Sequence, residues 1–441
     1  MAKYFGTNGA RGLINELTPE IVQKLAQATG VYLKKGKILV ARDGRLTGEL
    51  YFKAVAAGLL AAGCEIIDLG MVSSPTAEFM AKKLHANGLM IITASHNPPE
   101  WNGIKVVDGN GFAVSCERGE EIEKIAETLK INEHKAEGKL TKYETATEEH
   151  IAAILQHVNV EKIRKKKPKI VLDCGNGMAS LIAPQLFTRL GCEVIPFNSH
   201  VDGNFPGRPS EPTEANVQDM LKLVKETKAD AGFAWDGDAD RLIAADEHGN
   251  FIIGDKVFAL SVLLKLKEKK GPVVTTVATS LAIEDIAKAA GAKVVYTRIG
   301  APYLCESMKG AVIGGEEVGG VVWPEISLAK EGMLTAAKIV EAICDKPLSL
   351  WLKQLPEYKN IKEKIAADDK KKKQIVQQML DYAQKNKLDF TAIDGVRINY
   401  PHSWIIVRAS GTENYVRIFA EAKTEQEAKE LIKKHRTIIG E

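Results

Sequence analysis

The sequence has 441 residues, of which 45% are hydrophobic, and its 60 lysines and arginines nearly balance its 57 aspartates and glutamates. A single hydrophobic core stops growing well below this length, so we expect three or four domains. The formal charge of +3 excludes the strong positive field that is typical of a nucleic-acid-binding protein.

No stretch reaches the ~20 uninterrupted apolar residues that a membrane span needs, and the N-terminus lacks the apolar run of a signal peptide. The six cysteines occur singly, without the spacing of zinc ligands. We therefore expect a soluble cytoplasmic protein that acts on neither membranes nor nucleic acids.

A pattern of apolar strand, helix and second apolar strand recurs three times along the chain. It predicts first strands at residues 37–41, 169–173 and 273–276, helices near residues 51–62, 179–190 and 281–290, and second strands, each entered through a glycine, at residues 63–68, 191–195 and 291–296. Three copies of one βαβ pattern imply three related α/β domains with mixed sheets. Right-handed parallel crossovers place functional loops at the carboxyl edges of such sheets.

After Pro356 the pattern changes to that of a smaller α+β domain. It predicts a charged helix, strands at residues 392–398, 404–407 and 416–420, and a closing helix that begins at Thr424, where Glu427 completes a capping box. The expected domains are residues 1–150, 151–252, 253–356 and 357–441.

The strongest chemical signal is the segment Asp-Gly-Asp-Ala-Asp-Arg at residues 236–241, which follows the strand-like residues 231–235. Alternating carboxylates at Asp236, Asp238 and Asp240 can converge on one divalent cation and leave a position for a phosphate oxygen. An EF-hand would need glycine where Arg241 stands and a helix before the loop. Few protein ligands plus a substrate phosphate favour Mg²⁺ over Ca²⁺, and the alternative is an acidic surface turn.

Ser95 lies in Thr-Ala-Ser-His-Asn-Pro-Pro at residues 93–99, after the strand-like residues 89–92. No Gly-x-Ser-x-Gly surrounds it, so it is not a nucleophile elbow. We expect Asn102 and Gly103 to turn the loop and Lys105 to reach back toward Ser95, and the alternative for Lys105 is a solvated strand lysine. A serine that carries a phosphoryl group and a loop that holds a cation would together form a phosphoryl-transfer site.

Three further loops are candidates for binding oxyanions or sugars. Residues 6–12 form a flexible polar loop with Arg11, and residues 314–320 read Gly-Gly-Glu-Glu-Val-Gly-Gly, without a P-loop lysine or dinucleotide spacing. The turn Arg-Ala-Ser-Gly-Thr-Glu at residues 408–413, backed by Arg417, is typical of an anion cradle. The alternatives are an ordinary glycine turn and an ordinary hairpin.

Taken in order, these motifs resemble those of the alpha-D-phosphohexomutase superfamily over essentially the whole chain. The resemblance implies three similar α/β domains and a smaller C-terminal domain around a central cleft. The Gly-Glu-Glu-x-Gly-Gly form of the sugar loop is similar to that of archaeal members. Val318 and Gly320 stand where many members have serine and histidine, and Asn414 stands where they have proline, which leaves the second acid/base group open.

The resemblance implies that the protein interconverts hexose or hexosamine 6-phosphates and 1-phosphates through a phosphoserine and a 1,6-bisphosphate. One Mg²⁺ per chain, a bisphosphate primer and a monomer or homodimer are implied with it, and glucosamine, mannose and glucose phosphates remain open as substrates. The implied roles are Ser95 as phosphoserine and, with Asp236, Asp238 and Asp240, as metal ligand; Lys105 as proton shuttle; Arg11 and Arg241 at the transferring phosphate; Glu316 at the sugar hydroxyls; and Arg298, Arg408, Ser410, Gly411, Thr412 and Arg417 in substrate binding.

Two alternatives remain at this stage. A metal-dependent sugar phosphatase would use Ser95 as a transient nucleophile and release inorganic phosphate, although a second phosphate-binding turn argues against it. A non-catalytic sugar-phosphate sensor would bind its ligand without turnover.

Overall fold

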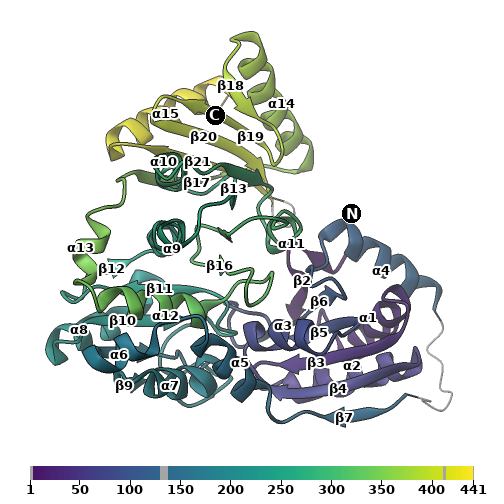
Figure 1. Ribbon diagram of the computed structural model, residues 1–441. Helices are drawn as coiled ribbons and strands as arrows, with labels where there is room; N and C mark the ends of the chain where they lie inside the picture. Colours follow the sequence, from purple (N-terminus) through teal and green to yellow (C-terminus); the bar gives the residue numbers. More distant parts are fainter. Residues whose placement is uncertain (1–2, 130–137, 411–413, 441) are drawn as a thin grey trace.

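The computed structural model describes residues 3–129, 138–410 and 414–440. In these residues four β-sheets follow one another along the chain, each packed with helices (Figure 1). The third sheet lies between the second sheet and the C-terminal sheet, and the first sheet lies beside the second, at the lower right of the view (Figure 1). The predicted fold class, three mixed α/β units and a smaller α+β unit, is confirmed.

The first sheet is mixed, with the order β1-β2-β6-β5-β3-β4-β7. Its parallel part is β5-β3-β4-β7, and β6, β2 and β1 add antiparallel strands at one edge. The elements are β1 (Phe5–Gly6), β2 (Gly9–Leu13), α1 (Pro19–Tyr32), β3 (Gly36–Arg42), α2 (Gly48–Ala61), β4 (Cys64–Met71), α3 (Ser74–Lys83), β5 (Gly88–Ile92), β6 (Trp101–Asp108), α4 (Cys116–Thr128) and β7 (Leu140–Lys142).

The second sheet has the order β12-β11-β10-β8-β9 and the third has the order β14-β13-β15-β16. The second unit contains α5 (Ala146–Leu155), α6 (Val160–Lys166), β8 (Lys169–Asp173), α7 (Ala179–Leu190), β9 (Glu193–Phe197), the 3₁₀ helix Glu214–Val217, α8 (Gln218–Thr227), β10 (Ala231–Trp235), β11 (Leu242–Ala245) and β12 (Phe251–Ile252). The third contains α9 (Gly254–Glu268), β13 (Val273–Thr276), α10 (Leu281–Ala289), β14 (Val294–Thr297), α11 (Ala301–Glu306), β15 (Ile313–Gly315), β16 (Val321–Val322), α12 (Gly332–Ile343) and α13 (Leu348–Leu352).

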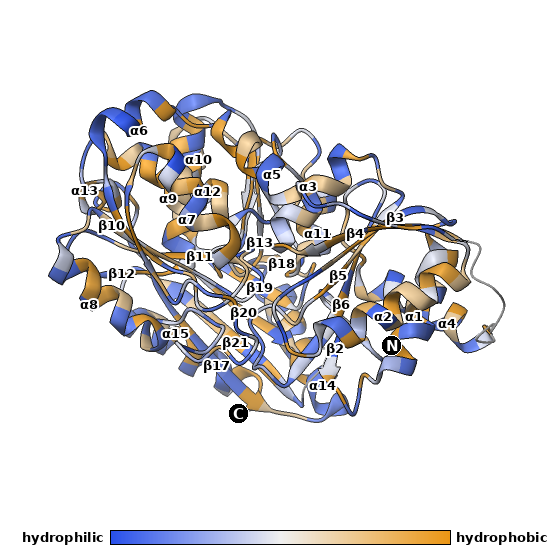
Figure 2. Ribbon diagram, turned by 90° about the horizontal axis from the view of Figure 1, so that it is seen from below, coloured by the Kyte–Doolittle hydropathy of each residue, from blue (hydrophilic) through white to orange (hydrophobic). Residues whose placement is uncertain are grey.

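The three predicted βαβ units are present, with β3-β4, β8-β9 and β13-β14 all parallel. Their apolar strands are buried because helices cover the sheets, and hydrophilic residues lie on outward turns such as those of α6 (Figure 2). One continuous apolar cluster runs from Ile151 to Leu355 and joins the second and third units. These two units therefore share a core, whereas the first and the C-terminal units each have their own.

The C-terminal unit departs from the sequence-based prediction at two places. It contains β17 (Lys359–Ala366), α14 (Asp369–Lys385), β18 (Asp389–Thr391), β19 (Val396–Tyr400), β20 (Ser403–Ala409), β21 (Tyr415–Ala422) and α15 (Glu425–Ile438). The charged helix is preceded by β17, which the prediction missed because this edge strand is largely exposed and carries alternating lysines. The predicted strand at residues 392–398 was wrong in its start, since a turn at Gly395, with φ of 72°, separates β18 from β19. The capping box of Thr424 and Glu427 is confirmed.

No helix in the described ranges combines the length and the apolar character that a membrane crossing requires.

The contact between α1 and α2 provides a test of packing against helix propensity. A Cβ at Gly58 would lie 2.2 Å from the carbonyl oxygen of Gln23 and 2.9 Å from Cβ of Ala26. Alanine is favoured over glycine inside a helix by about 1 kcal/mol, but overpacking a core costs about 1–3 kcal/mol. We therefore expect Gly58→Ala to lower the midpoint of thermal unfolding, as measured by circular dichroism. Ala57→Gly, on the exposed face of α2, is the control and should lose only the propensity difference; a Gly58→Ala variant more stable than the wild type would contradict the packing argument.

Candidate active site

Ser95 and the acidic loop meet at the boundary between the first and second units. Ser95 follows β5, and its Oγ donates a hydrogen bond to Asp236 Oδ2 at 2.7 Å, across 141 positions of sequence. Its φ is 51°, in the left-handed region, and its amide donates to Thr93 Oγ1 at 2.8 Å. Strained backbone of this kind persists only where the surroundings hold it, which is common at functional sites.

Arg45, which the sequence analysis missed, holds the serine loop in place. Arg45 is 3% exposed, and its guanidinium pairs with Asp43, which also accepts a hydrogen bond from Thr93. The same guanidinium donates to four backbone carbonyls, those of Ser95 at 2.9 Å, Asn97 at 2.6 Å, Pro98 at 2.5 Å and Trp101 at 2.8 Å. From the second unit, Ser210 Oγ donates to the carbonyl of Ser95 at 2.9 Å. Arg45 follows β3, whose carboxyl end lies level with that of β5, and that shared edge was the available signal.

The acidic loop is the turn of the β10–β11 hairpin, so the strand flanks expected from the sequence are present. One carboxylate oxygen from each of Asp236, Asp238 and Asp240 lies within 4.8 Å of the others, and all three residues are buried. Ser74 binds the loop from the first unit, with its Oγ 2.6 Å from Asp238 Oδ2. Asp238 Oδ1 and Asp240 Oδ1 are buried without a hydrogen-bond partner among the described residues. Unpaired buried carboxylate oxygens fit a hard cation, so the triad suits Mg²⁺.

The aspartates differ in their affinity for a proton. Burial raises the pKa of Asp236 well above its ordinary value, and its aspartate neighbours raise it further. Burial also raises the pKa of Asp238, but Lys105 outweighs it and holds this pKa below its ordinary value. The cluster therefore keeps its charge mainly where a lysine is in contact with it.

Lys105 lies inside β6 and joins the acidic loop directly. Its Nζ is 2.5 Å from Asp238 Oδ2 and 3.3 Å from Asp240 Oδ2. Burial lowers the pKa of Lys105, but the two aspartates outweigh it and keep this pKa raised. The alternative of a solvated lysine is wrong, and so is the expected turn at Asn102 and Gly103, which lie within β6 and pair with β2.

Lys330 is a second buried lysine at the site, and no sequence motif pointed to it. Its Nζ is 3.1 Å from Asp240 Oδ2 and 2.9 Å from Glu316 Oε1, so it joins the acidic loop to the predicted sugar loop. Burial lowers the pKa of Lys330, but Asp240 and Glu316 outweigh it and raise this pKa. Glu316 is thus brought to the site, as expected from the sequence.

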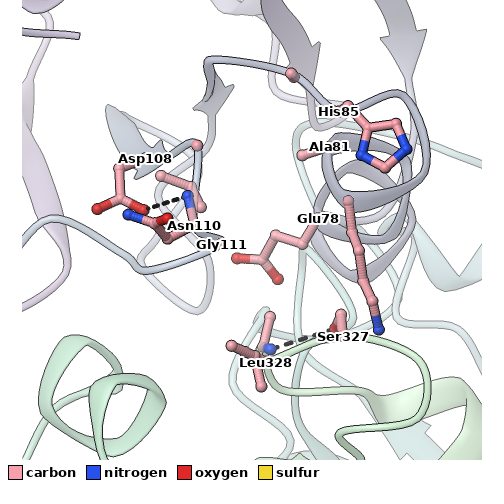
Figure 3. A pocket seen from close by; sticks show the side chains of 13 residues that line it. Glu78, Ala81, His85, Asp108, Asn110, Gly111, Ser327 and Leu328 are labelled. Carbon is pink, nitrogen blue, oxygen red and sulfur yellow. Dashed lines mark hydrogen bonds between the residues drawn. The ribbon is translucent and has the colours of Figure 1, made fainter. Parts of the chain in front are cut away.

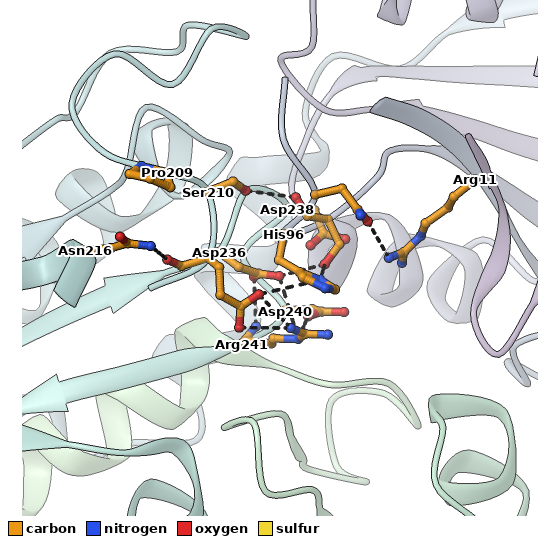
Figure 4. A network of polar contacts seen from close by, with 12 residues as sticks. Arg11, His96, Pro209, Ser210, Asn216, Asp236, Asp238, Asp240 and Arg241 are labelled. Carbon is orange, nitrogen blue, oxygen red and sulfur yellow. Dashed lines mark hydrogen bonds and ion pairs between the residues drawn. The ribbon is translucent and has the colours of Figure 1, made fainter. Parts of the chain in front are cut away.

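Two arginines lie beside the triad with buried nitrogen atoms that have no hydrogen-bond acceptor (Figure 4). Arg11 Nη1 donates to Asn97 Oδ1 at 3.3 Å, and Arg241 Nη1 pairs with Glu211 at 3.2 Å. Nε of each makes no hydrogen bond among the described residues, and Arg241 Nε lies 3.8 Å from Asp240 Oδ1. Burial and the cations Arg241 and Arg11 lower the pKa of His96 to about 2. An incoming anion would satisfy both guanidinium groups.

The residues predicted to bind the distal phosphate lie mainly in the C-terminal unit, whereas the cluster around the triad is formed by the first three units. Arg408 pairs with Asp394 at 2.7 Å, and Arg417 Nη2 lies 3.1 Å from the Tyr415 hydroxyl, both on the C-terminal sheet. Ser410 lies in the same hairpin, whereas Gly411 and Thr412 fall outside the described residues. Arg298 is half exposed and pairs with Glu117 of the first unit at 2.7 Å.

A cavity of about 410 Å³ lies next to the site, between α3, the turn at residues 108–111 and the loop at residues 327–329 (Figure 3). Glu78 projects into it and also lines a smaller cavity together with Lys105, Asp240 and Lys330. Burial raises the pKa of Glu78 to about 8, against the effect of Lys105.

Comparison with known families places this geometry in context. Four family models match successive parts of the chain: Phosphoglucomutase/phosphomannomutase alpha/beta/alpha domain I at residues 2–133, domain II at 148–249, domain III at 253–358 and the C-terminal domain at 361–437. The chain belongs to the phosphoglucomutase/phosphomannomutase family. As a member of this family it is a phosphohexomutase, an enzyme of the isomerase class that acts as an intramolecular phosphotransferase.

Relatives of this phosphohexomutase are found among archaea. A phosphoglucomutase/phosphomannomutase of Thermococcus kodakarensis is 42% identical, covering 98% of this chain and 97% of that protein. A phosphoglucosamine mutase of Methanococcus vannielii is 38% identical, again covering 98% of this chain and 97% of its own length.

Solved structures resemble the phosphohexomutase over its whole length. A phosphoglucomutase/phosphomannomutase family protein from Burkholderia thailandensis superimposes with a TM-score of 0.87 and 26% identity, covering 99% of this chain and 96% of the other. An N-acetylphosphoglucosamine mutase of Aspergillus fumigatus, in complex with GlcNAc-6P and magnesium, shares the fold with a TM-score of 0.61 and 16% identity, covering 100% and 96%.

The role of Arg45 as a positioning residue can be tested by Arg45→Met. We expect turnover to fall at least about 100-fold, because the serine loop loses its hydrogen-bond donors, and misplacing a reacting group by ~1 Å can cost that much. The unfolding midpoint should fall too, since four carbonyls lose a hydrogen bond from the charged guanidinium and Asp43 loses its ion pair. Arg189→Met, which removes an exposed ion pair with Glu148, is the control and should leave both measurements unchanged. Wild-type turnover in Arg45→Met would show that the loop holds its shape without the guanidinium.

The raised pKa of Glu78 predicts a pH dependence of stability. Between its ordinary pKa of 4.5 and its folded pKa of about 8, the folded protein holds a proton that the unfolded chain releases. The free energy of unfolding therefore falls as pH rises through this window. Glu78→Gln should not show this fall, because glutamine does not titrate. In urea titrations with EDTA, we expect the stability of Glu78→Gln relative to wild type to increase from pH 5 to pH 8. A constant difference across this range would place Glu78 in an ordinary aqueous environment.

Proposed function

We propose that the protein interconverts hexose or hexosamine 6-phosphates and 1-phosphates through a phosphoserine at residue 95 and a sugar 1,6-bisphosphate. The observation that carries this proposal is the 2.7 Å hydrogen bond from Ser95 Oγ to Asp236, within a buried acidic triad. A serine side chain placed beside a cation site is what a phosphoryl carrier requires.

In the forward step, the P–O bond to Ser95 Oγ breaks and a P–O bond to a sugar hydroxyl oxygen forms. The hydroxyl proton must leave, and the serine oxygen must gain a proton, so the step needs no external acid or base. Lys105, charged and in contact with the triad, can deliver one proton to Ser95 while it receives one from the hydroxyl. We therefore assign Lys105 the role of proton shuttle.

The groups around Ser95 would neutralise the negative charge of the transferring phosphoryl group. Asp236, Asp238 and Asp240, with the phosphorylated Ser95, would hold one Mg²⁺, which supplies electrostatic stabilisation of the transferring phosphoryl group when bound. Nε of Arg11 and Nε of Arg241 make no hydrogen bond among the described residues, so both can donate to the equatorial phosphoryl oxygens. Burial of the cluster keeps water from the phosphoserine, which favours transfer to a sugar over hydrolysis.

One site must serve both half-reactions, so the bisphosphate has to turn over between them. We propose that the C-terminal hairpin holds whichever phosphate is not reacting, through Arg408, Ser410, Gly411, Thr412 and Arg417, with Arg298 at the rim. Glu316 would accept hydrogen bonds from sugar hydroxyls in either orientation. A hexose 1,6-bisphosphate would serve as the primer that phosphorylates Ser95.

The names of the relatives bear on the substrate. Proteins called phosphoglucosamine mutase and phosphoglucomutase/phosphomannomutase both match almost the full chain, so we propose glucosamine, mannose and glucose phosphates as the substrate set. We place the enzyme in the cytoplasm as a monomer or homodimer; its six free cysteines fit a reducing compartment.

The test of this function is Ser95→Ala, assayed for conversion of the three sugar 6-phosphates to 1-phosphates with Mg²⁺ and a bisphosphate primer. We expect loss of mutase activity by more than about 1,000-fold, because no other group in the pathway can carry the phosphoryl group. Mass spectrometry should find phosphate on Ser95 of the primed wild type.

Ser349→Ala is the control, since that hydroxyl bonds to Glu247 and not to the triad. Near wild-type turnover by Ser95→Ala would refute the role of the serine. Steady release of inorganic phosphate without isomerised sugar would instead identify a phosphatase.

A further inference from the structure

The sugar loop has no polar side chain at Val318 or Gly320, and the stem of Lys330, from another loop, fills the space beside Gly320. A Cβ at Gly320 would lie 2.2 Å from Cδ and 3.0 Å from Cγ of Lys330, and 3.2 Å from Glu316 Oε1. Such distances are too short for non-bonded carbon atoms. The stem of Lys330 therefore occupies the volume that any side chain at position 320 would need.

Backbone hydrogen bonds hold the sugar loop, residues 314–320, against the β10–β11 hairpin that carries the acidic loop. The amide of Glu316 donates to the carbonyl of Gly320 at 3.0 Å, and the amide of Leu242 donates to the carbonyl of Gly319 at 3.1 Å. Gly319 has a φ of 86°, and a Cβ there would lie 2.2 Å from the Leu242 carbonyl oxygen. This close approach requires glycine and brings the sugar loop beside Asp240, at the start of β11.

Lys330 is itself fixed from both sides. Its backbone forms a bridge with Val322, and the next residue, Glu331, caps α12 through the amides of Met333 and Leu334. Glu331 also lies 2.9 Å from the buried His150. The backbone fixes where the side chain starts, and the ion pairs of Nζ with Asp240 and Glu316 hold its end.

The ammonium of Lys330 has three N–H donors, and two carboxylates engage it: Glu316 of the sugar loop and Asp240 of the metal loop. The residue also lines the small cavity that Lys105, Asp240 and Glu78 share. Among the described residues the ammonium thus has one N–H donor beyond these two ion pairs, and its Nζ lies between Glu316 and Asp240.

We propose that Lys330 is a substrate-contacting residue, which orients Glu316 toward the sugar hydroxyls and donates a hydrogen bond to the oxygen atom at the junction of sugar and transferring phosphoryl group. In this chain it takes the place of polar side chains at positions 318 and 320. The inference rests on the proposed mutase function and assigns a contact within that site.

Lys330→Met tests the contact, since methionine keeps an unbranched stem and removes the charge. We expect kcat/KM to fall by about 100-fold or more, the cost of removing one preorganised donor, and Lys330→Arg to recover at least about tenfold of that loss. The matched control is Lys338→Met, another buried and ion-paired lysine, on α12, which should keep wild-type kcat/KM.

A double-mutant cycle separates substrate contact from a structural role. Gly320→Ala should reduce kcat/KM in the wild-type background because the new Cβ displaces Lys330, but should cost little in a Lys330→Ala background, where the space is vacant. Additive effects, or a Lys330→Met enzyme with wild-type kcat/KM, would overturn the inference. A third outcome would also overturn the inference. In it, Lys330→Met lowers the unfolding midpoint but leaves the affinity for a sugar 6-phosphate, measured by calorimetry, unchanged.

Failure of the mutase proposal gives a different result. In that case the wild type isomerises none of the three sugar phosphates, and Lys330 variants have no activity to lose. An active wild type with indifferent Lys330 variants refutes only the role of Lys330.

Discussion

The hydrogen bond between Ser95 and Asp236 is the contact on which the rest of the site depends. It joins a loop at the carboxyl edge of the first sheet to a hairpin of the second, and both partners are buried. Two buried polar groups are stable only if their remaining atoms are also satisfied. Arg45 and Ser210 donate to the carbonyl of Ser95, and the amide of Arg241 donates to Asp236 Oδ1 at 3.2 Å, so these remaining atoms have partners.

The second constraint is charge balance in a buried volume. Three aspartates and Glu316 lie among Lys105, Lys330, Arg11 and Arg241, and each ion pair offsets part of the cost of removing charge from water. Hydrogen bonding is incomplete, since one carboxylate oxygen of Asp238, one of Asp240 and Nε of Arg11 and Arg241 make no hydrogen bond among the described residues. A cation and a phosphate would complete the balance, which explains why these residue types gather here.

The charged groups of the site come from units that are packed in different ways. The second and third units share one hydrophobic core, so the acidic loop and the loop at residues 314–320 belong to one packed body. Lys330 links these two loops directly. The first unit has its own core and contributes Ser95, Lys105 and Arg11 from its carboxyl and antiparallel edges. The candidate site therefore lies where two separately packed bodies meet.

Periodicity and turn chemistry in the sequence were enough to predict the three βαβ units, the α+β tail, the capping box at Thr424 and the alternating aspartates. These features are local, because strand, helix and loop signals depend on residues a few positions apart. The sequence did not reveal β17, the strand position of Asn102, or the exposed pairing of Arg298 with Glu117.

Only the tertiary structure decided which lysines and arginines reach the site. Arg45 and Lys330 carry no motif, and they matter because sheet edges and a shared core bring them to residues far away in the sequence. The sequence shows that position 320 has no side chain. The side chain that fills the space beside it is that of Lys330, ten positions later, and the path of that loop depends on packing. Local patterns determine residue type and element, whereas long-range packing determines which charges become neighbours.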